Sequence, residues 1–183
     1  MSMPVNQYFK SERLLYRPLQ MEDVHPYVKM CNEASRRRWF YFQEPHCLTE
    51  AFWIRGMENN IATWSRRVNV LKDDCGLAIV RKEDRALIGL VGISKFHGPE
   101  EELADVEIGY HIGEAYQGNG YGTEAAIAAV EWGLAELREF GAVPKIVGKA
   151  EHENKSSRRV LEKAGFTFVH EEPYLSVYER IGD

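Results

Sequence analysis

The chain has 183 residues, of which 44% are hydrophobic and 28% charged, with a formal net charge of −5. These values are typical of a soluble globular protein, and we predict that residues 1–183 form a single domain. The acidic balance argues against a nucleic-acid partner. No apolar run approaches the length of about 18 residues that indicates a transmembrane helix, and the first residues lack the apolar stretch of a secretory signal. We therefore expect no membrane association and a cytoplasmic location.

The cysteines and histidines give no sign of a metal or disulfide framework. Cys31, Cys47 and Cys75 are odd in number, and no two have CxxC spacing. The histidines are scattered without an HxxxH helical pair. We expect reduced cysteines and no bound metal.

The first third of the chain predicts one strand followed by two helices. Residues 13–17 form a short apolar strand that Pro18 ends. Residues 20–38 predict one helix, which begins near Pro26 and has acidic residues early and arginines late. Thr49 is placed as the N-cap of a second helix over residues 50–67.

From residue 76 onward, alternating apolar residues predict strands, and two helical segments interrupt them. The predicted strands cover 76–82, 87–96, 104–114, 145–151, 166–172 and 174–180. A helix of roughly 18 residues follows the third strand, with Ile127, Val130, Leu134 and Leu137 as its apolar stripe. Gly141 ends that helix, and Gly165 ends a shorter one that begins near Asn154.

This order of elements predicts an α/β protein with a mixed sheet. The long helix joins the strand at 104–114 to the strand at 145–151. A helical crossover of this kind connects parallel strands, so these two strands should run parallel.

The segment 116–124, YQGNGYGTE, places three glycines between a predicted strand and a predicted helix. Glycines permit positive φ and can turn several backbone N–H groups toward one point, where the helix N-terminus adds partial positive charge. The segment matches neither the Walker pattern nor the Rossmann GxGxxG pattern. Taken alone, it is equally consistent with a phosphate-binding loop and with a glycine-rich turn that binds nothing.

Four segments together resemble the GNAT N-acetyltransferases. Gln117–Gly122 matches the Q/R-x-x-G-x-G/A coenzyme A loop of that family, and Asn154–Phe166 resembles its N-x-x-S segment ending in Gly-Phe. Glu107–Tyr110, EIGY, and Ser11–Pro18, SERLLYRP, are similar to segments of its RimJ/RimL-like branch. The four segments occur in the family's order across nearly the whole chain.

The resemblance implies the GNAT fold, in which two parallel central strands splay apart and hold acetyl-CoA between them. Those strands would be 104–112 and 145–150. The residues that the resemblance assigns to acetyl-CoA are His111, Ile112, Gln117, Gly118, Asn119, Gly120, Tyr121, Gly122, Thr123, Asn154 and Ser157. The amides near His111 and Ile112 would bind the thioester carbonyl at a bulge. The basic residues Arg158, Arg159 and Lys163 are candidates for contact with the 3′-phosphate, with a simply solvated basic face as the favoured alternative.

The resemblance also implies direct attack by an amine, with no covalent acyl-enzyme. Glu107 is the candidate general base, with a purely structural carboxylate as the alternative reading, and Asp105 and His111 are weaker candidates. Ser157 would donate a proton to the departing sulfur. Asn154 would contact the pantetheine arm, cap the short helix, or do both. Many relatives have a tyrosine general acid at the position where this chain has Leu161. The chain departs from the family there, so we do not assign a tyrosine general acid.

The acceptor is less defined than the cofactor. Trp39, Phe40, Tyr41 and Phe42 are candidate pocket residues. A protein N-terminal α-amine, with a pKa near 8, asks less of a base than a lysine with a pKa near 10.4. A polyamine or aminoglycoside-like amine stays an alternative, as do a non-catalytic acyl-CoA-binding module and a nucleotide-binding protein. We expect a monomer or a homodimer.

Overall fold

The structure is a computed structural model that describes residues 8–39, 49–95 and 105–182. Its strands are β1 (Phe9–Lys10), β2 (Leu14–Arg17), β3 (Cys75–Arg81), β4 (Leu87–Lys95), β5 (Val106–Ile112), β6 (Lys145–Glu151), β7 (Thr167–Glu171) and β8 (Leu175–Ile181). Its α-helices are α1 (Val24–Cys31), α2 (Ala34–Trp39), α3 (Glu50–Trp64), α4 (Tyr121–Glu139) and α5 (Lys155–Lys163). Short 3₁₀ turns lie at Met21–Asp23 and Glu114–Tyr116.

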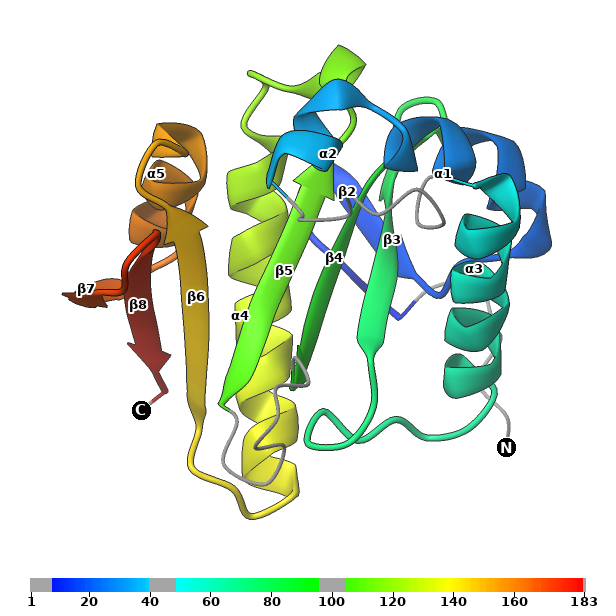
Figure 1. The fold of residues 1–183 in the computed structure, drawn as a ribbon. Coiled ribbons are helices and arrows are strands. Elements are labelled where there is room, and N and C mark those ends of the chain that lie inside the picture. Colours follow the sequence, from blue (N-terminus) through cyan, green and yellow to red (C-terminus); the bar gives the residue numbers. More distant parts are fainter. Residues whose placement is uncertain (1–7, 40–48, 96–104, 183) are drawn as a thin grey trace.

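The described strands form one mixed sheet with the order β1-β2-β3-β4-β5-β6-β8-β7 (Figure 1). Neighbouring strands are antiparallel except β5 and β6, which are parallel and in register at Glu107 and Val147. The predicted α/β class and the predicted parallel pair are therefore confirmed. The helix α4 connects these two strands, as a parallel pair requires.

Two apolar cores cover the two faces of the sheet. Alternate residues of β3 divide between them: Leu77 and Ile79 belong to the core that includes α4, whereas Ala78 and Val80 belong to the core that includes α1 and α3. This alternation is the expected consequence of the period of two in a strand that is covered on both sides. In Figure 1, α1 and α3 lie over the β2–β4 part of the sheet, and α4 crosses its opposite face.

The predicted helix at 20–38 is two helices. It begins at Val24, close to Pro26 as expected, but α1 ends at Cys31 and α2 starts at Ala34. Asn32 interrupts the helix, because its side-chain amide donates to the Val28 carbonyl at 3.0 Å and its backbone leaves the helical region. The next helix, α3, begins after the Thr49 cap as predicted, but ends at Trp64, three residues before the predicted end.

The predicted apolar stripe of α4 is wrong at one position. Val130, Leu134 and Leu137 are buried, but Ile127 is 38% exposed. The buried face is instead completed by small residues, including Ala126, Ala129 and Gly133. A Cβ on Gly133 would lie 3.0 Å from Ile93 and from Ile146. The helix approaches the sheet through small residues. The predicted stripe considered only large apolar side chains and therefore did not include them.

Of the three cysteines, Cys31 and Cys75 are buried and free, and Cys47 lies outside the described residues. No helix in the described ranges has the length and apolarity needed to cross a membrane. The predicted break at 97–103 also lies outside those ranges.

Candidate active site

The strands β5 and β6 pair only near Glu107 and then diverge toward their C-terminal ends (Figure 1). A cleft of about 690 Å³ lies at this divergence. Its walls come from β5, from the glycine segment, from the end of β6 and from α5. Every residue proposed for acetyl-CoA lines it except Asn119. The topology therefore brings together two motifs that are far apart in the sequence.

The glycine segment supplies backbone donors to this cleft. Gly118 and Gly120 have φ values of 78° and 79°, which favour glycine. Within the described residues, the amides from Gly118 to Thr123 donate no hydrogen bond to a protein acceptor. They directly precede or open α4, whose N-terminus carries partial positive charge. This is the arrangement that binds phosphate groups in proteins.

Two side chains of the segment form hydrogen bonds that hold the loop, and of these Gln117 also lines the cleft. The amide of Asn119 donates to the carbonyls of Tyr116 and Gln117 at 3.1 and 3.0 Å. The amide of Gln117 donates to the Ile112 carbonyl at 2.8 Å, which closes the end of β5. A Cβ on Gly120 would contact Arg13 at 3.5 Å. The requirement for glycine at 120 is therefore its positive φ rather than lack of room.

The first turn of α5 faces the same cleft. Asn154 accepts a hydrogen bond at its side-chain Oδ1 from the Ser157 backbone amide at 3.1 Å and caps the helix. Its side-chain nitrogen makes no protein hydrogen bond within the described residues. The Ser157 hydroxyl lies 2.8 Å from the Tyr110 hydroxyl, which also donates to the Ser157 carbonyl at 3.1 Å. A hydrogen-bonded pair of hydroxyls thus joins β5 to α5.

Of the basic residues on α5, Arg159 and Lys163 line the cleft. Arg158 does not: its guanidinium donates to the Tyr178 hydroxyl at 3.0 Å.

Glu107 lies where the two strands part. Its carboxylate is 3.5 Å from the Lys149 ammonium. Burial raises the pKa of Glu107, and the attraction of Lys149 only partly opposes this. Asp105 instead forms an ion pair with Lys145 at 2.9 Å and does not line the cleft. The structure therefore separates the two carboxylates that the sequence placed on one strand face.

His111 is buried at the opposite end of β5. Burial, together with the positive charge of Arg36, lowers its pKa to about 4. Its imidazole lies 3.4 Å from the Glu33 carboxylate, but this contact is not an ion pair at neutral pH, because the imidazole is uncharged.

The resemblance implied a bulge in β5, but the register of β5 against β4 is continuous from Val106 to Ile112. The Gly113 amide donates to the Ile88 carbonyl at 2.9 Å. Because successive residues of a strand point their amides to opposite sides, this bond places the His111 amide toward β4. The amides of Tyr110 and Ile112 then face β6 and the cleft.

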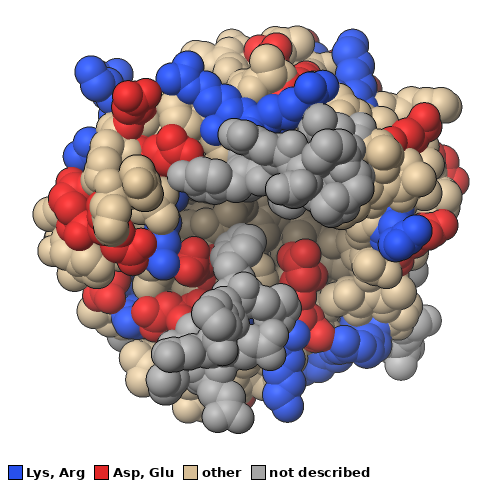
Figure 2. All heavy atoms as spheres, viewed as in Figure 1, with Lys and Arg blue, Asp and Glu red and all other residues tan. Residues whose placement is uncertain are grey.

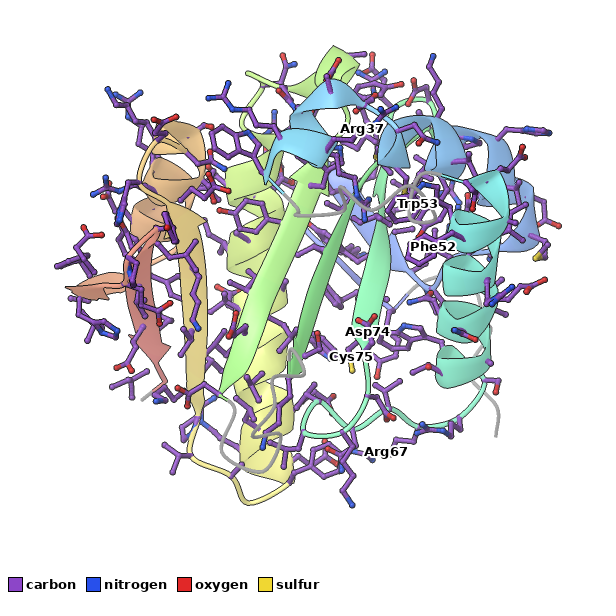
Figure 3. All side chains as sticks on the ribbon, in the orientation of Figure 1. Arg37, Phe52, Trp53, Arg67, Asp74 and Cys75 are labelled. Carbon is purple, nitrogen blue, oxygen red and sulfur yellow. The ribbon has the colours of Figure 1, made fainter. Side chains whose placement is uncertain are left out.

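A second cavity of about 320 Å³ lies on the α1–α3 side of the sheet. Phe52 and Trp53 extend into this region from α3 (Figure 3), and Arg36 lies over the Trp53 ring at 5.1 Å. The two cavities share Gly109, Tyr110 and His111, so they meet at β5. Figure 2 shows the hollow on this face, with acidic side chains beside it. Trp39 lines the first cleft, whereas Phe40, Tyr41 and Phe42 lie outside the described residues.

Sequence reasoning did not single out four residues of this region: Arg13, Arg36, Tyr110 and Lys149. Tyr110 and Arg13 do stand within quoted motifs, so their positions carried a signal but their roles did not. No group of three or more metal-ligating side chains occurs among the residues that the structure describes.

Comparison with known proteins identifies the family. The profile described as "Acetyltransferase (GNAT) domain" matches residues 13–167. The chain therefore belongs to the GNAT acetyltransferase family. It is 30% identical over 170 residues to the uncharacterized N-acetyltransferase p20 of Bacillus licheniformis, covering 93% of this chain and 86% of that protein. It is 28% identical to the probable N-acetyltransferase YjcK of Bacillus subtilis, covering 86% and 82%. Its match to YjdG of the same species, at 35% identity, spans about half of each chain, 50% and 51%.

Solved structures agree on the fold. An acetyltransferase from Agrobacterium tumefaciens is 26% identical, with a TM-score of 0.71 and coverage of 100% of this chain and 96% of that one. RimL, an acetyltransferase of ribosomal protein L7/L12 solved with coenzyme A, has a TM-score of 0.66 at 19% identity, covering 97% and 96%. A spermidine N-acetyltransferase from Vibrio cholerae, solved with CoA and spermine, has a TM-score of 0.65 at 17% identity. The match covers 91% of this chain and 93% of that one.

Gly120→Ala should lower coenzyme A affinity at least tenfold. At a φ of 79° an alanine strains the backbone by about 1–2 kcal/mol, and relief of that strain turns the amides away from the cleft. Gly141→Ala is the matched control, because Gly141 has a φ of 69°, open space around it, and a position at the far end of α4. Calorimetric titration with coenzyme A should separate the two variants, although both lose stability. Equal affinities would contradict the assignment of the loop.

His111 should make the protein sensitive to acid. Its pKa of about 4 lies below the unfolded value of 6.5, so the stability that it contributes is present above pH 6.5 and is lost as pH falls toward 4. The loss amounts to about 3 kcal/mol near pH 4. Urea unfolding of the wild type and His111→Gln at about pH 7.5 and about pH 4 should show this extra loss only in the wild type. Parallel pH profiles would contradict it.

Proposed function

We propose that this protein transfers the acetyl group of acetyl-CoA to a primary amine, with a protein N-terminal α-amine as the acceptor. The observation that carries the proposal is the run of backbone amides from Gly118 to Thr123 at one end of a cleft with the partly buried Glu107 carboxylate at the other. The strand β5 runs between these two ends and spans roughly 17 Å from Glu107 to Ile112. Anion binding and proton acceptance are thus separated by the length of one strand.

The residues present fit acetyl-CoA. The amides and the α4 N-terminus suit its pyrophosphate, and Arg159 and Lys163 suit its 3′-phosphate. The Asn154 side-chain nitrogen is a donor for the amide carbonyls of its arm. Acetyl-CoA supplies an activated acyl group, so the chain itself need only position the amine and move two protons.

Glu107 is proposed as the base that takes a proton from the acceptor amine, directly or through a water. The pKa of Glu107 is raised toward neutral pH, which makes this carboxylate a stronger base than an exposed one. The neighbouring Lys149 ammonium favours the ionised form of this carboxylate. His111 is less suited to this role, because its low pKa makes it a weak base.

Ser157 is proposed as the proton donor to the departing sulfur. Its hydroxyl is held by the Tyr110 hydroxyl at 2.8 Å. Burial raises the pKa of Tyr110 to about 12, so this partner stays protonated at neutral pH. The cleft-facing amides of Tyr110 and Ile112, rather than that of His111, would stabilise charge on the thioester oxygen.

We propose an acceptor with a single amine, although the second cavity is lined by both a cation, Arg36, and a carboxylate, Asp74. Arg36 is buried in its wall, and its positive charge contributes to the low pKa of His111. A polyamine placed there would bring further positive charge close to this guanidinium. A peptide N-terminus has one ammonium group, which Glu107 attracts, followed by uncharged peptide groups. We therefore propose the RimJ/RimL-like branch, with a small amine as the alternative acceptor.

An acceptor panel tests the proposal. Acetyl-CoA is incubated with unblocked peptides, the same peptides blocked at the N-terminus but containing lysine, spermidine, and an aminoglycoside. Thiol release and the mass of each acceptor are measured. We expect acetylation of the unblocked peptides at the α-amine. Faster acetylation of spermidine or the aminoglycoside would support the small-amine alternative. Tight coenzyme A binding with no transfer would indicate a binding module.

Glu107→Gln should lower kcat/KM about 100-fold, because it removes the proposed base. In the wild type, kcat/KM should fall with decreasing pH as Glu107 is protonated, at a pH above the usual value of 4.5 because its pKa is raised. The variant should lack this decline. Glu151→Gln is the matched control, since Glu151 lines the same cleft. If Glu107→Gln kept the wild-type kcat/KM and its decline at low pH, Glu107 would have a structural role only.

A further inference from the structure

The N-terminal motif Ser11–Pro18 lies against the glycine segment, although more than 100 positions separate the two in sequence. The Ser11 hydroxyl and the Arg13 amide both donate to the Glu124 carboxylate, each at 2.7 Å. Glu124 stands in the first turn of α4. The motif thus contacts the helix terminus that the proposed function assigns to the pyrophosphate, but from outside the cleft, because neither Ser11 nor Arg13 lines it.

The Arg13 guanidinium makes contacts in three directions. Its Nε donates to the Glu124 carboxylate at 2.7 Å, and its Nη1 donates to the Asn119 carbonyl at 3.0 Å. Its planar face covers the Tyr121 ring at 4.5 Å. One rigid side chain therefore holds the helix, the loop and the ring between them in a fixed relation.

The bond to Asn119 fixes the direction of the next amide. The structure contains no cis peptide among its described residues, and in a trans peptide the carbonyl and the following N–H point in opposite directions. The Asn119 carbonyl points to Arg13. The Gly120 N–H therefore points away from Arg13 and into the cleft that Gly120 lines.

We propose that Arg13 is a positioning residue for cofactor binding: it holds the peptide between Asn119 and Gly120 so that the Gly120 amide faces the pyrophosphate. The inference rests on the proposed function. The loop needs such a restraint, because Gly118 and Gly120 both have wide conformational freedom. Ordering the loop on binding would otherwise cost affinity, and a preformed loop avoids that cost.

Glu124 has a matching role. A carboxylate in the first turn of α4 would repel a phosphate at the same helix end unless its charge were compensated. The hydrogen bonds from Ser11 and Arg13 outweigh the effect of its burial and lower its pKa, so it stays ionised. Its charge is compensated by Arg13, and its two oxygens anchor the arginine. Arg13 is thereby directed to Glu124 and Asn119 rather than to a phosphate.

The test compares Arg13→Met with Arg66→Met. Methionine keeps much of the length and apolar contact of arginine but removes the hydrogen bonds. Arg66 is the matched control, because it forms a bidentate pair with Asp73 at 2.8 and 2.6 Å and does not line the cleft. Calorimetric titration gives the Kd of each protein for coenzyme A and for 3′-dephospho-coenzyme A. We expect roughly tenfold weaker binding of both ligands by Arg13→Met, with no change in Arg66→Met.

The two ligands distinguish positioning from direct contact with the 3′-phosphate. If Arg13 touched the 3′-phosphate, its replacement would weaken coenzyme A but not the dephospho ligand, and the proposal would be overturned. Unchanged binding of both would overturn it as well. Failure of the wild type to bind either ligand would instead contradict the proposed function.

A second variant and a spectroscopic readout keep the test decisive if Arg13→Met folds poorly. Glu124→Gln keeps the arginine but weakens its anchor, so positioning predicts weaker coenzyme A binding. Direct contact predicts tighter binding, because the arginine is released. In the wild type, the ¹⁵N-resolved amide proton of Gly120 should shift strongly downfield on adding coenzyme A. The shift should be much smaller in either variant, and an equal shift would contradict the proposal.

Discussion

The separation of β5 from β6 is the constraint on which the rest of the molecule depends. Two parallel strands that pair at Glu107 and Val147 and then part leave backbone groups without ladder partners. Unpaired backbone groups in a buried place are costly, so the gap must offer them other partners. The Tyr110 hydroxyl, bonded to Ser157, is one link across it. The gap is otherwise open to a ligand that can bond to strand edges.

Each neighbouring element has a role at this gap. The helix α4 packs against the paired strands. Its N-terminus lies at the mouth of the cleft, next to the backbone amides of the glycine segment. The short helix α5 forms the opposite wall, with its Asn154 cap and Ser157 facing inward. On the other face, α1 and α3 leave a second cavity that reaches the same strand at Tyr110 and His111. One strand, β5, is therefore shared by two cavities, which suits a reaction between two ligands.

Charge is distributed in keeping with this arrangement. Partial positive charge and basic side chains occur at the α4 and α5 end of the cleft, and the partly buried Glu107 lies at the other. The chain as a whole carries a net charge of −5, so the local positive region depends on the loop and a few placed side chains rather than on composition. The Arg13–Glu124 pair adds a fixed contact between the N-terminal motif and this region.

The sequence predicted what short-range signals encode. The alternation of apolar residues located the strands. The helical crossover between β5 and β6 predicted that these two strands are parallel. The glycines identified the loop because positive φ at 118 and 120 is a local requirement. The break at Asn32 and the exposure of Ile127 were missed, because a side-chain bond and close packing of small residues decide them.

The contacts of Arg13 and Tyr110 were missed for a different reason. Each side chain bonds a residue far away in sequence, Asn119 and Ser157 respectively, and only the folded sheet brings these pairs together. Family resemblance indicated which segments matter, but not which atoms meet.

The most direct test of the central claim is thermal unfolding with acetyl-CoA, coenzyme A, ATP and NAD, each added separately. A ligand that binds only the folded protein adds about 2.7 kcal/mol of stability at 100 times its Kd. We expect acetyl-CoA and coenzyme A to raise the unfolding temperature, and ATP and NAD to have little effect. Stabilisation by ATP or NAD but not by coenzyme A would contradict the assignment of the cleft.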